Sequence, residues 1–318
     1  MARPTDPAEL FDAALAGDRG ALARLLSYVE RGGEVGRQVG RLAYPRSGGA
    51  YTVGLTGAPG SGKSTLTSAA IAHLRSLGIE IAVLAIDPSS PFTGGAILGD
   101  RVRMQDHATD PGVFIRSMAT RGHLGGLALA TPEAVRLLDA VGREWVIIET
   151  VGVGQVEVEV AGKADTTVVV VNPGWGDSVQ ANKAGLMEIA DVFVINKADR
   201  SGVAETRRDL EQMLELSDLP ADAWRPPILA TVASSGDGVA EMWSAVLAHR
   251  EHAERSGVLA ERRSFRTREE LRDIVANRLR ERAREICTGE RWDELTERVV
   301  NHRADPWDAA DEMLAGLA

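Results

Sequence analysis

Residues 57–65, GAPGSGKST, have the composition and spacing of a phosphate-binding loop. They satisfy the pattern G-x-x-x-x-G-K-[ST], in which glycines let backbone N–H groups turn toward phosphate oxygens. In such a loop Lys63 would bridge the β- and γ-phosphates of a nucleotide, and Ser64 would coordinate Mg²⁺. A chance glycine turn is disfavoured, because a strand-like run precedes the motif and a helical pattern follows it. The expected nucleotide-binding residues are Gly57, Ala58, Pro59, Gly60, Ser61, Gly62, Lys63, Ser64 and Thr65.

A second motif indicates which base the nucleotide carries. FVINKADR contains N-K-x-D, with Asn196, Lys197 and Asp199 at the end of an apolar run. The Asp199 carboxylate can accept hydrogen bonds from guanine N1–H and the exocyclic amine, whereas adenine offers neither donor there. Alone the motif is weak, but its place after the phosphate loop favours GTP and GDP over ATP. The stretch TVASSGDG, residues 231–238, is either a plain turn or a loop that closes over the guanine around Ser234.

Three carboxylates are candidates for the Mg²⁺ shell, because this ion prefers a few oxygen ligands and keeps several waters. Asp87 ends the run IEIAVLAID, and Asp100 follows a glycine-bearing segment; either could instead cap a turn or helix. Glu149 ends WVIIET, where many GTP-hydrolysing proteins have Asp, and would hold a metal-bound water or polarise the attacking water. Gln155 lacks the spacing of a water-positioning glutamine, so we expect slow intrinsic turnover. The expected catalytic residues are Lys63, Glu149 and Asp100.

The elements that position these residues alternate along the chain. Nearly continuous Val/Ile runs separated by helical patterns are typical of a parallel sheet with helices on both faces. The fold class expected is therefore α/β, a P-loop GTPase fold with a mostly parallel central sheet. The runs expected as strands are YTVGLTG, IEIAVLAID, VFIRSM, WVIIET, TTVVVVNP, VFVINKAD and PILATVAS.

Helical patterns flank this region on both sides. We expect an N-terminal helical extension over 1–48, the GTPase domain over 49–250, and a C-terminal helical region over 251–318. A glycine-rich, polar stretch leads from the first helices to Tyr51. Near the C-terminus, REELRDIVANRLRERAREI carries an apolar stripe that must be buried somewhere. Packing on its own domain and contact with a second copy are both open, and the C-terminal region is expected to form a homodimer.

Composition limits the class of protein. The 318 residues carry a formal net charge of −10, which argues against a nucleic-acid binder, since such proteins need a basic surface. No run of apolar residues is long enough for a membrane span, and no signal peptide is indicated. The single cysteine, Cys287, fits a reducing cytoplasm, which is the expected location.

Several stretches together resemble one family closely, the MeaB/ArgK-type GTPases, which are G-protein chaperones of adenosylcobalamin-dependent methylmalonyl-CoA mutase. The resemblance runs in order from about residue 15 to 250. It is carried by GAPGSGKST, AIDPSSPFTGGAILGDRVRM, IRSMATRGHLGGLA, IIETVGVGQVEVEV, GWGDSVQANKAGLMEIAD and INKAD. The resemblance implies GTP hydrolysis that gates loading of adenosylcobalamin and protects the mutase. It also implies switch loops at 88–104 and 150–160, and a third at 174–188 that touches the mutase through Asp177, Gln180 and Lys183.

Two other classes share the phosphate loop. A nickel metallochaperone GTPase should carry histidine- or cysteine-rich clusters, and one Cys with scattered His speaks against it. A small-molecule kinase should hold an acceptor pocket, and a guanine-reading N-K-x-D is not expected there.

Overall fold

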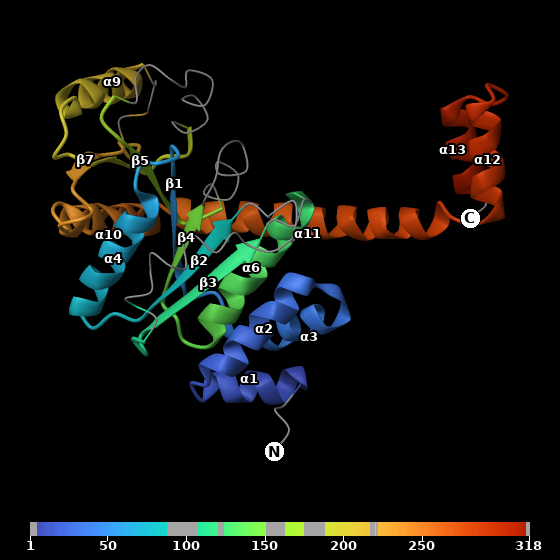
Figure 1. Ribbon diagram of the computed structural model, residues 1–318, viewed down its shortest axis with the longest axis horizontal. Coiled ribbons are helices and arrows are strands. Elements are labelled where there is room, and N and C mark those ends of the chain that lie inside the picture. The colour runs from blue at the N-terminus through green and yellow to red at the C-terminus, as the bar shows by residue number, and fades with distance from the viewer. Residues whose placement is uncertain are drawn as a thin grey trace. The chain divides into compact units, whose positions relative to one another are not determined.

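The computed structural model describes residues 5–87, 107, 109–119, 124–150, 163–174, 188–216, 220 and 222–315. Within these ranges seven parallel strands form one sheet in the order β3-β2-β4-β1-β5-β6-β7 (Figure 1). The α/β fold with a mostly parallel sheet is thereby confirmed. The strands are β1 (Tyr51–Gly57), β2 (Ile81–Asp87), β3 (Val113–Ala119), β4 (Trp145–Thr150), β5 (Thr166–Val171), β6 (Val192–Asn196) and β7 (Ile228–Thr231).

The helices connect the strands and extend the chain at both ends. At the N-terminal end lie α1 (Pro7–Leu15), α2 (Arg19–Arg31), α3 (Gly33–Ala43) and the short 3₁₀ helix η1 (Tyr44–Arg46). Between the strands lie α4 (Lys63–Ser76), α6 (Leu124–Ala140) and α9 (Val203–Glu215). The C-terminal helices are α10 (Val239–Arg255), α11 (Val258–Ile286), α12 (Glu290–Val300) and α13 (Pro306–Ala315).

Helices cover both faces of the sheet, which explains why its strands are apolar without alternation. In β2, Leu84 belongs to the core cluster on one face and Val83 to the cluster on the other. The first cluster includes residues of α1, α2, α3 and α6, and the second includes residues of α4 and α10. A smaller cluster packs α9 against β5 and β6. Because all seven strands are parallel, their carboxyl ends meet at one edge of the sheet, which is where parallel α/β sheets bind ligands.

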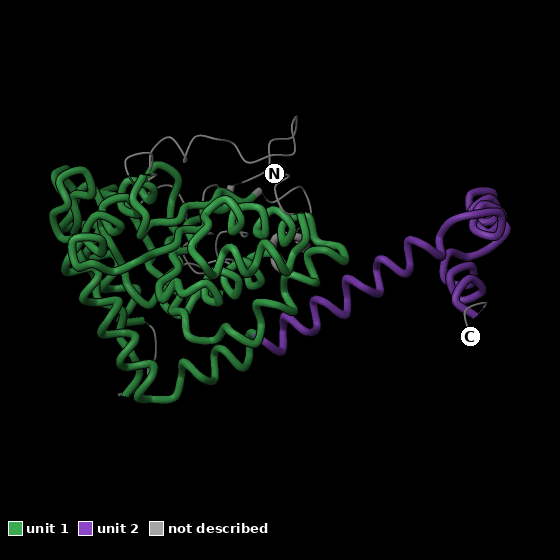
Figure 2. The backbone as a smooth tube through the Cα atoms, turned by 90° about the horizontal axis from the view of Figure 1, so that it is seen from below, with its two compact units in different colours: residues 1–266 green, residues 267–318 purple. Residues whose placement is uncertain are grey.

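The N-terminal helices share a core with the sheet. The glycine-rich stretch before Tyr51 contains the helix α3, whose glycine at position 36 lies against α2, so that a β-carbon there would be 2.8 Å from Tyr28 O. Arg116 of β3 forms an ion pair with Glu30 of α2 at 2.7 Å. The expected domain boundaries at 48/49 and 250/251 remain a prediction. By contact density the chain divides into two compact units, Met1–Arg266 and Thr267–Ala318, and the division falls within α11 (Figure 2).

Truncation of Leu25 tests this shared core. Leu25 of α2 is fully buried, and Leu25→Ala should lower the free energy of unfolding by about 2–5 kcal/mol through the cavity it leaves. Leu77, at the end of α4, is 59% exposed, and Leu77→Ala is the matched control with little expected effect. Urea denaturation followed by circular dichroism measures both. Equal midpoints for Leu25→Ala and the parent protein would mean that α2 does not belong to the cooperative core.

Among the described residues, no side chain of α11 is fully buried, although Leu259 is partly buried against the core. The exposed fractions of Leu271, Val275 and Leu279 are 61%, 49% and 65%, so these residues of the expected apolar stripe are exposed. Among the described residues, no helix combines the length and the apolar character needed to cross a membrane.

Candidate nucleotide site

The phosphate-binding loop joins β1 to α4 at the carboxyl edge of the sheet. Its glycines Gly57, Gly60 and Gly62 have φ values of 142°, 73° and 92°, in the region that favours glycine. A β-carbon at position 57 would lie 1.9 Å from Val170 O, and one at position 62 would lie 2.4 Å from Asn196 Nδ2. Backbone conformation and close packing both require glycine at these two positions, as the motif predicts.

Lys63 is the first residue of α4 and is 7% exposed. Its ammonium group lies across the loop, where Nζ donates to Gly57 O at 2.7 Å and to Ala58 O at 3.3 Å. No side chain among the described residues caps the N-terminus of α4, so its backbone N–H groups and helix dipole favour an anion. The loop therefore fits a phosphate group, with Lys63 as the neutralising charge.

The side chains of Asn196 and Lys197 hold the loop from the end of β6, which β5 separates from β1 in the sheet. Asn196 is 2% exposed, and its Nδ2 donates to Ser61 O at 2.8 Å. Lys197 has a φ of 60°, and its Nζ donates to Gly60 O at 2.6 Å. The structure thus brings the two sequence motifs into direct contact, although more than 130 residues separate them.

The amide oxygen of Asn196 is held in turn by the loop after β7. Thr231 Oγ1 and the Ala233 backbone N–H both donate to Asn196 Oδ1, each at 3.1 Å. These two donors fix the orientation of the amide, so that Nδ2 points to the phosphate loop. Thr231 was not among the site residues expected from the sequence, because only its neighbourhood, TVASSGDG, carried a signal.

Replacement of Thr231 tests this positioning role. Thr231→Val keeps the shape of the side chain but removes the donor to Asn196 Oδ1, and should weaken GTP binding about tenfold. Thr231→Ser restores the hydroxyl and should restore most of the affinity. Titration with a fluorescent guanine nucleotide measures both, and thermal unfolding checks that the fold is kept. Equal affinities in the valine variant and the parent would remove Thr231 from this role.

The remaining expected residues lie at the same edge or outside the described residues. Asp199 and Ser234 are both exposed, in the turns after β6 and β7. Glu149 is fully buried near the end of β4, in register with Leu55 of β1. Ser64, the second residue of α4, is 6% exposed.

The other candidates lie outside the part of the chain that the structure describes. Asp100, the side chain of Asp87, and the partner-coupling residues Asp177, Gln180 and Lys183 all lie outside the described residues. In the ranges that the structure describes, no group of three or more His, Cys, Asp or Glu side chains converges as a metal site. Ser64 and Glu149 offer oxygen donors, which is the donor type that Mg²⁺ prefers.

The fold and this site define the class of protein: a P-loop GTPase, with the phosphate loop and the N-K-x-D motif in contact at the carboxyl edge of the sheet. The family described as "Methylmalonyl Co-A mutase-associated GTPase MeaB" matches residues 22–288. The chain belongs to this family, and it is a GTPase that binds guanine nucleotides.

Individual relatives agree with this assignment. A protein of Pyrococcus abyssi, named as a GTPase, is 51% identical over 308 residues, which cover 96% of this chain and 95% of the relative. The GTPase ArgK of Escherichia coli is 40% identical over 80% of each chain. Among solved structures, a protein titled "LAO/AO transport system kinase" is similar, with a TM-score of 0.73 and 26% identity over 100% of this chain and 99% of the other.

Proposed function

We propose that this GTPase is a chaperone that gates the loading of adenosylcobalamin into methylmalonyl-CoA mutase and protects the loaded enzyme. The observation that carries the proposal is the family match over residues 22–288, because that family is described by its association with this mutase. The mutase-contacting residues are proposed to be Asp177, Gln180 and Lys183.

The proposed chemistry is hydrolysis of GTP to GDP and phosphate with Mg²⁺. Lys63 neutralises charge on the β- and γ-phosphates, and the N-terminus of α4 supplies backbone donors. Ser64, Asp87, Asp100 and Glu149 are the proposed oxygen ligands of the ion or of its bound waters. The proposed guanine reader is Asp199, with backbone groups around Ser234 closing the pocket.

We propose further that the protein works as a homodimer through its C-terminal helices. Leu271, Val275 and Leu279 follow one another at four-residue spacing on α11 and are each about half exposed or more. Trp307 of α13 is 81% exposed. A second copy would cover such apolar side chains, and sedimentation of the chain as a monomer at micromolar concentration would contradict this part of the proposal.

The mutase role is tested by a loading assay. Apo-mutase is mixed with the protein and adenosylcobalamin in the presence of GTP, GDP, a non-hydrolysable GTP analogue or ATP. We expect a stable complex by gel filtration, and cobalamin loading, read from its absorbance, that differs between GTP and the non-hydrolysable analogue. Absence of a complex, together with loading that no guanine nucleotide changes, would contradict the proposal.

The fate of the γ-phosphate separates a chaperone from a small-molecule kinase. Hydrolysis releases inorganic phosphate, whereas a kinase transfers the phosphoryl group to an acceptor molecule. We expect all of the γ-phosphate to appear as inorganic phosphate. Transfer of label from γ-³²P-GTP to an added amino acid would favour the kinase instead.

A further inference from the structure

Two buried aspartates lie at the amino-terminal edge of the sheet, opposite to the nucleotide site. Asp165 comes directly before β5 and Asp191 directly before β6, and their side chains are 2% and 6% exposed. Each carboxylate accepts a hydrogen bond from a backbone N–H of a neighbouring strand in the sheet. Asp165 accepts from Thr52 of β1 at 3.0 Å, and Asp191 accepts from Thr167 of β5 at 2.8 Å. The same arrangement thus occurs twice and ties β1, β5 and β6 together where they begin.

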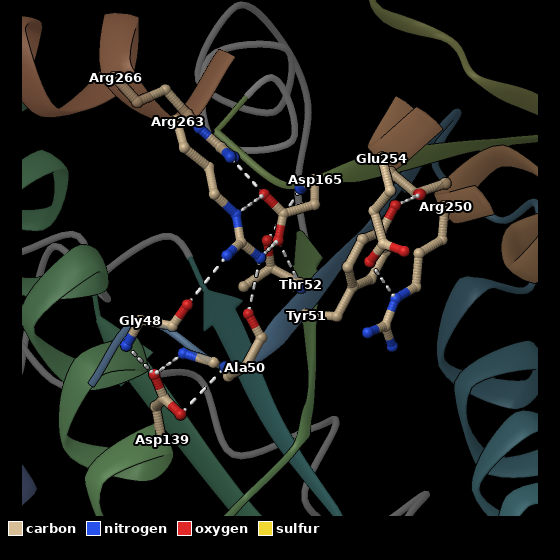
Figure 3. Close-up of polar contacts among 12 residues, drawn as sticks. Gly48, Ala50, Tyr51, Thr52, Asp139, Asp165, Arg250, Glu254, Arg263 and Arg266 are labelled. Carbon is tan, nitrogen blue, oxygen red and sulfur yellow. Dashed lines mark hydrogen bonds and ion pairs between the residues drawn. The ribbon is translucent and has the colours of Figure 1, made fainter. Parts of the chain in front are cut away.

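The first turns of α11 supply arginines to Asp165. Arg263 donates two hydrogen bonds to this carboxylate, from Nε to Oδ1 at 3.0 Å and from Nη2 to Oδ2 at 2.6 Å (Figure 3). Arg263 also donates to Ala50 O at 2.8 Å and to Gly48 O at 3.1 Å, on the chain that enters β1. Arg266, one turn further along, donates to the same carboxylate (Figure 3). The two-donor contact of Arg263 and the additional contact of Arg266 therefore hold α11 at the start of β1 and β5.

Asp191 is contacted by Arg262 of the same helix. Arg262 Nη1 donates to its two carboxylate oxygens at 3.0 and 3.3 Å. On its other side, His249 Nε2 of α10 lies 3.1 Å from Asp191 Oδ1. The indole of Trp224 donates to the Asp191 backbone carbonyl at 2.7 Å. We call Asp165, Asp191, Arg262, Arg263 and Arg266 the arginine latch.

The latch is held by charge. Burial alone would raise the pKa of Asp165, but the hydrogen bond from Arg263 and the charge of Arg266 lower it below its ordinary value. The pKa of Asp191 is lowered in the same way against burial, by His249 and Arg262. Both carboxylates are therefore charged at neutral pH, and a buried charge is stable only while its partners stay in place.

The two strands that start at the latch end on the phosphate-binding loop. β5 ends beside Gly57, which pairs with Val170 in a contact too close for a β-carbon. β6 ends at Asn196, whose amide donates to Ser61 O. The loop that would hold the phosphates therefore contacts the carboxyl ends of both strands.

We propose that the arginine latch is a joint that couples the nucleotide bound at the phosphate loop to the docking of the first turns of α11. In this proposal, a displacement of β5 and β6 at the loop moves Asp165 and Asp191 at the other ends of these strands. The arginines that bind the two carboxylates then move the start of α11. The joint belongs to the GTPase cycle of the chain itself and does not depend on which partner the GTPase serves.

Hydrogen exchange measured by mass spectrometry on the full-length protein tests the coupling. The readout is amide exchange in peptides covering 258–266, with GDP and with a non-hydrolysable GTP analogue. We expect the two states to differ about fivefold or more in exchange rate. In Arg263→Met and Asp165→Asn the exchange should be faster in both states, and the difference between nucleotides should disappear.

Arg272→Met is the matched control, because this arginine is 74% exposed and pairs with Glu269 on its own helix. It should keep the full nucleotide dependence. Equal exchange in the two nucleotide states of the parent protein would overturn the proposal without any variant. So would a difference that persists in Arg263→Met, or one that Arg272→Met abolishes. Light scattering in both nucleotides separates a change in the latch from a change in self-association.

Discussion

Replacement of Lys63 by alanine should lower the rate of GTP hydrolysis by about 10²–10³-fold, because it removes the neutralising charge from the phosphate loop. Lys63 is 7% exposed, and its Nζ donates to Gly57 O at 2.7 Å, within the loop. Release of inorganic phosphate under single-turnover conditions measures the loss.

An exposed arginine provides the comparison for this variant. Arg208→Ala removes a cation from the surface of α9 and should leave hydrolysis unchanged. Circular dichroism of the alanine variant at position 63 should match the parent. Hydrolysis at the parental rate in that variant would contradict the assignment of the loop as the catalytic phosphate site.

Asp199→Asn should weaken GTP binding by about 10²–10⁴-fold, because it removes the carboxylate proposed to accept two hydrogen bonds from guanine. The amide offers an N–H donor where the carboxylate offers only acceptors. Xanthine carries a carbonyl where guanine carries its amine, so the variant should gain affinity for xanthosine triphosphate. Displacement of a fluorescent guanine nucleotide by each triphosphate measures both effects.

The xanthine result separates base reading from general damage to the site. Asp222→Asn changes another exposed aspartate of the same chain and should leave both affinities unchanged. A loss of GTP affinity in Asp199→Asn without the gain for xanthosine triphosphate would point to a structural role. Unchanged GTP affinity would remove Asp199 from the site.

Local patterns in the sequence were sufficient to predict the sheet and the phosphate loop. Each expected strand run contains a strand, since an apolar Val/Ile run bounded by turn residues is a local signal. The helix α6 was less visible, because Gly125, Gly126 and Pro132 interrupt its pattern. The helix α3 was hidden in the same way, and only its packing against α2 explains why glycine occupies position 36.

Contacts between distant residues could not be read in advance. Asp165 and Arg263 are 98 positions apart, and neither belongs to a motif. Their pairing depends on how the helix at the C-terminal side returns to the amino edge of the sheet. Thr231 was missed for a related reason, since its role follows from the amide of Asn196, which is 35 positions away. Motifs locate the groups that meet the ligand, whereas the residues that hold them require the fold.

Phosphate release from GTP and from ATP, each measured with and without methylmalonyl-CoA mutase, tests the central claim most directly. The N-K-x-D motif predicts release from GTP and little from ATP, and the proposed chaperone role predicts slow turnover that rises when the mutase is added. Equal hydrolysis of ATP, or fast GTP turnover that the mutase leaves unchanged, would contradict this account.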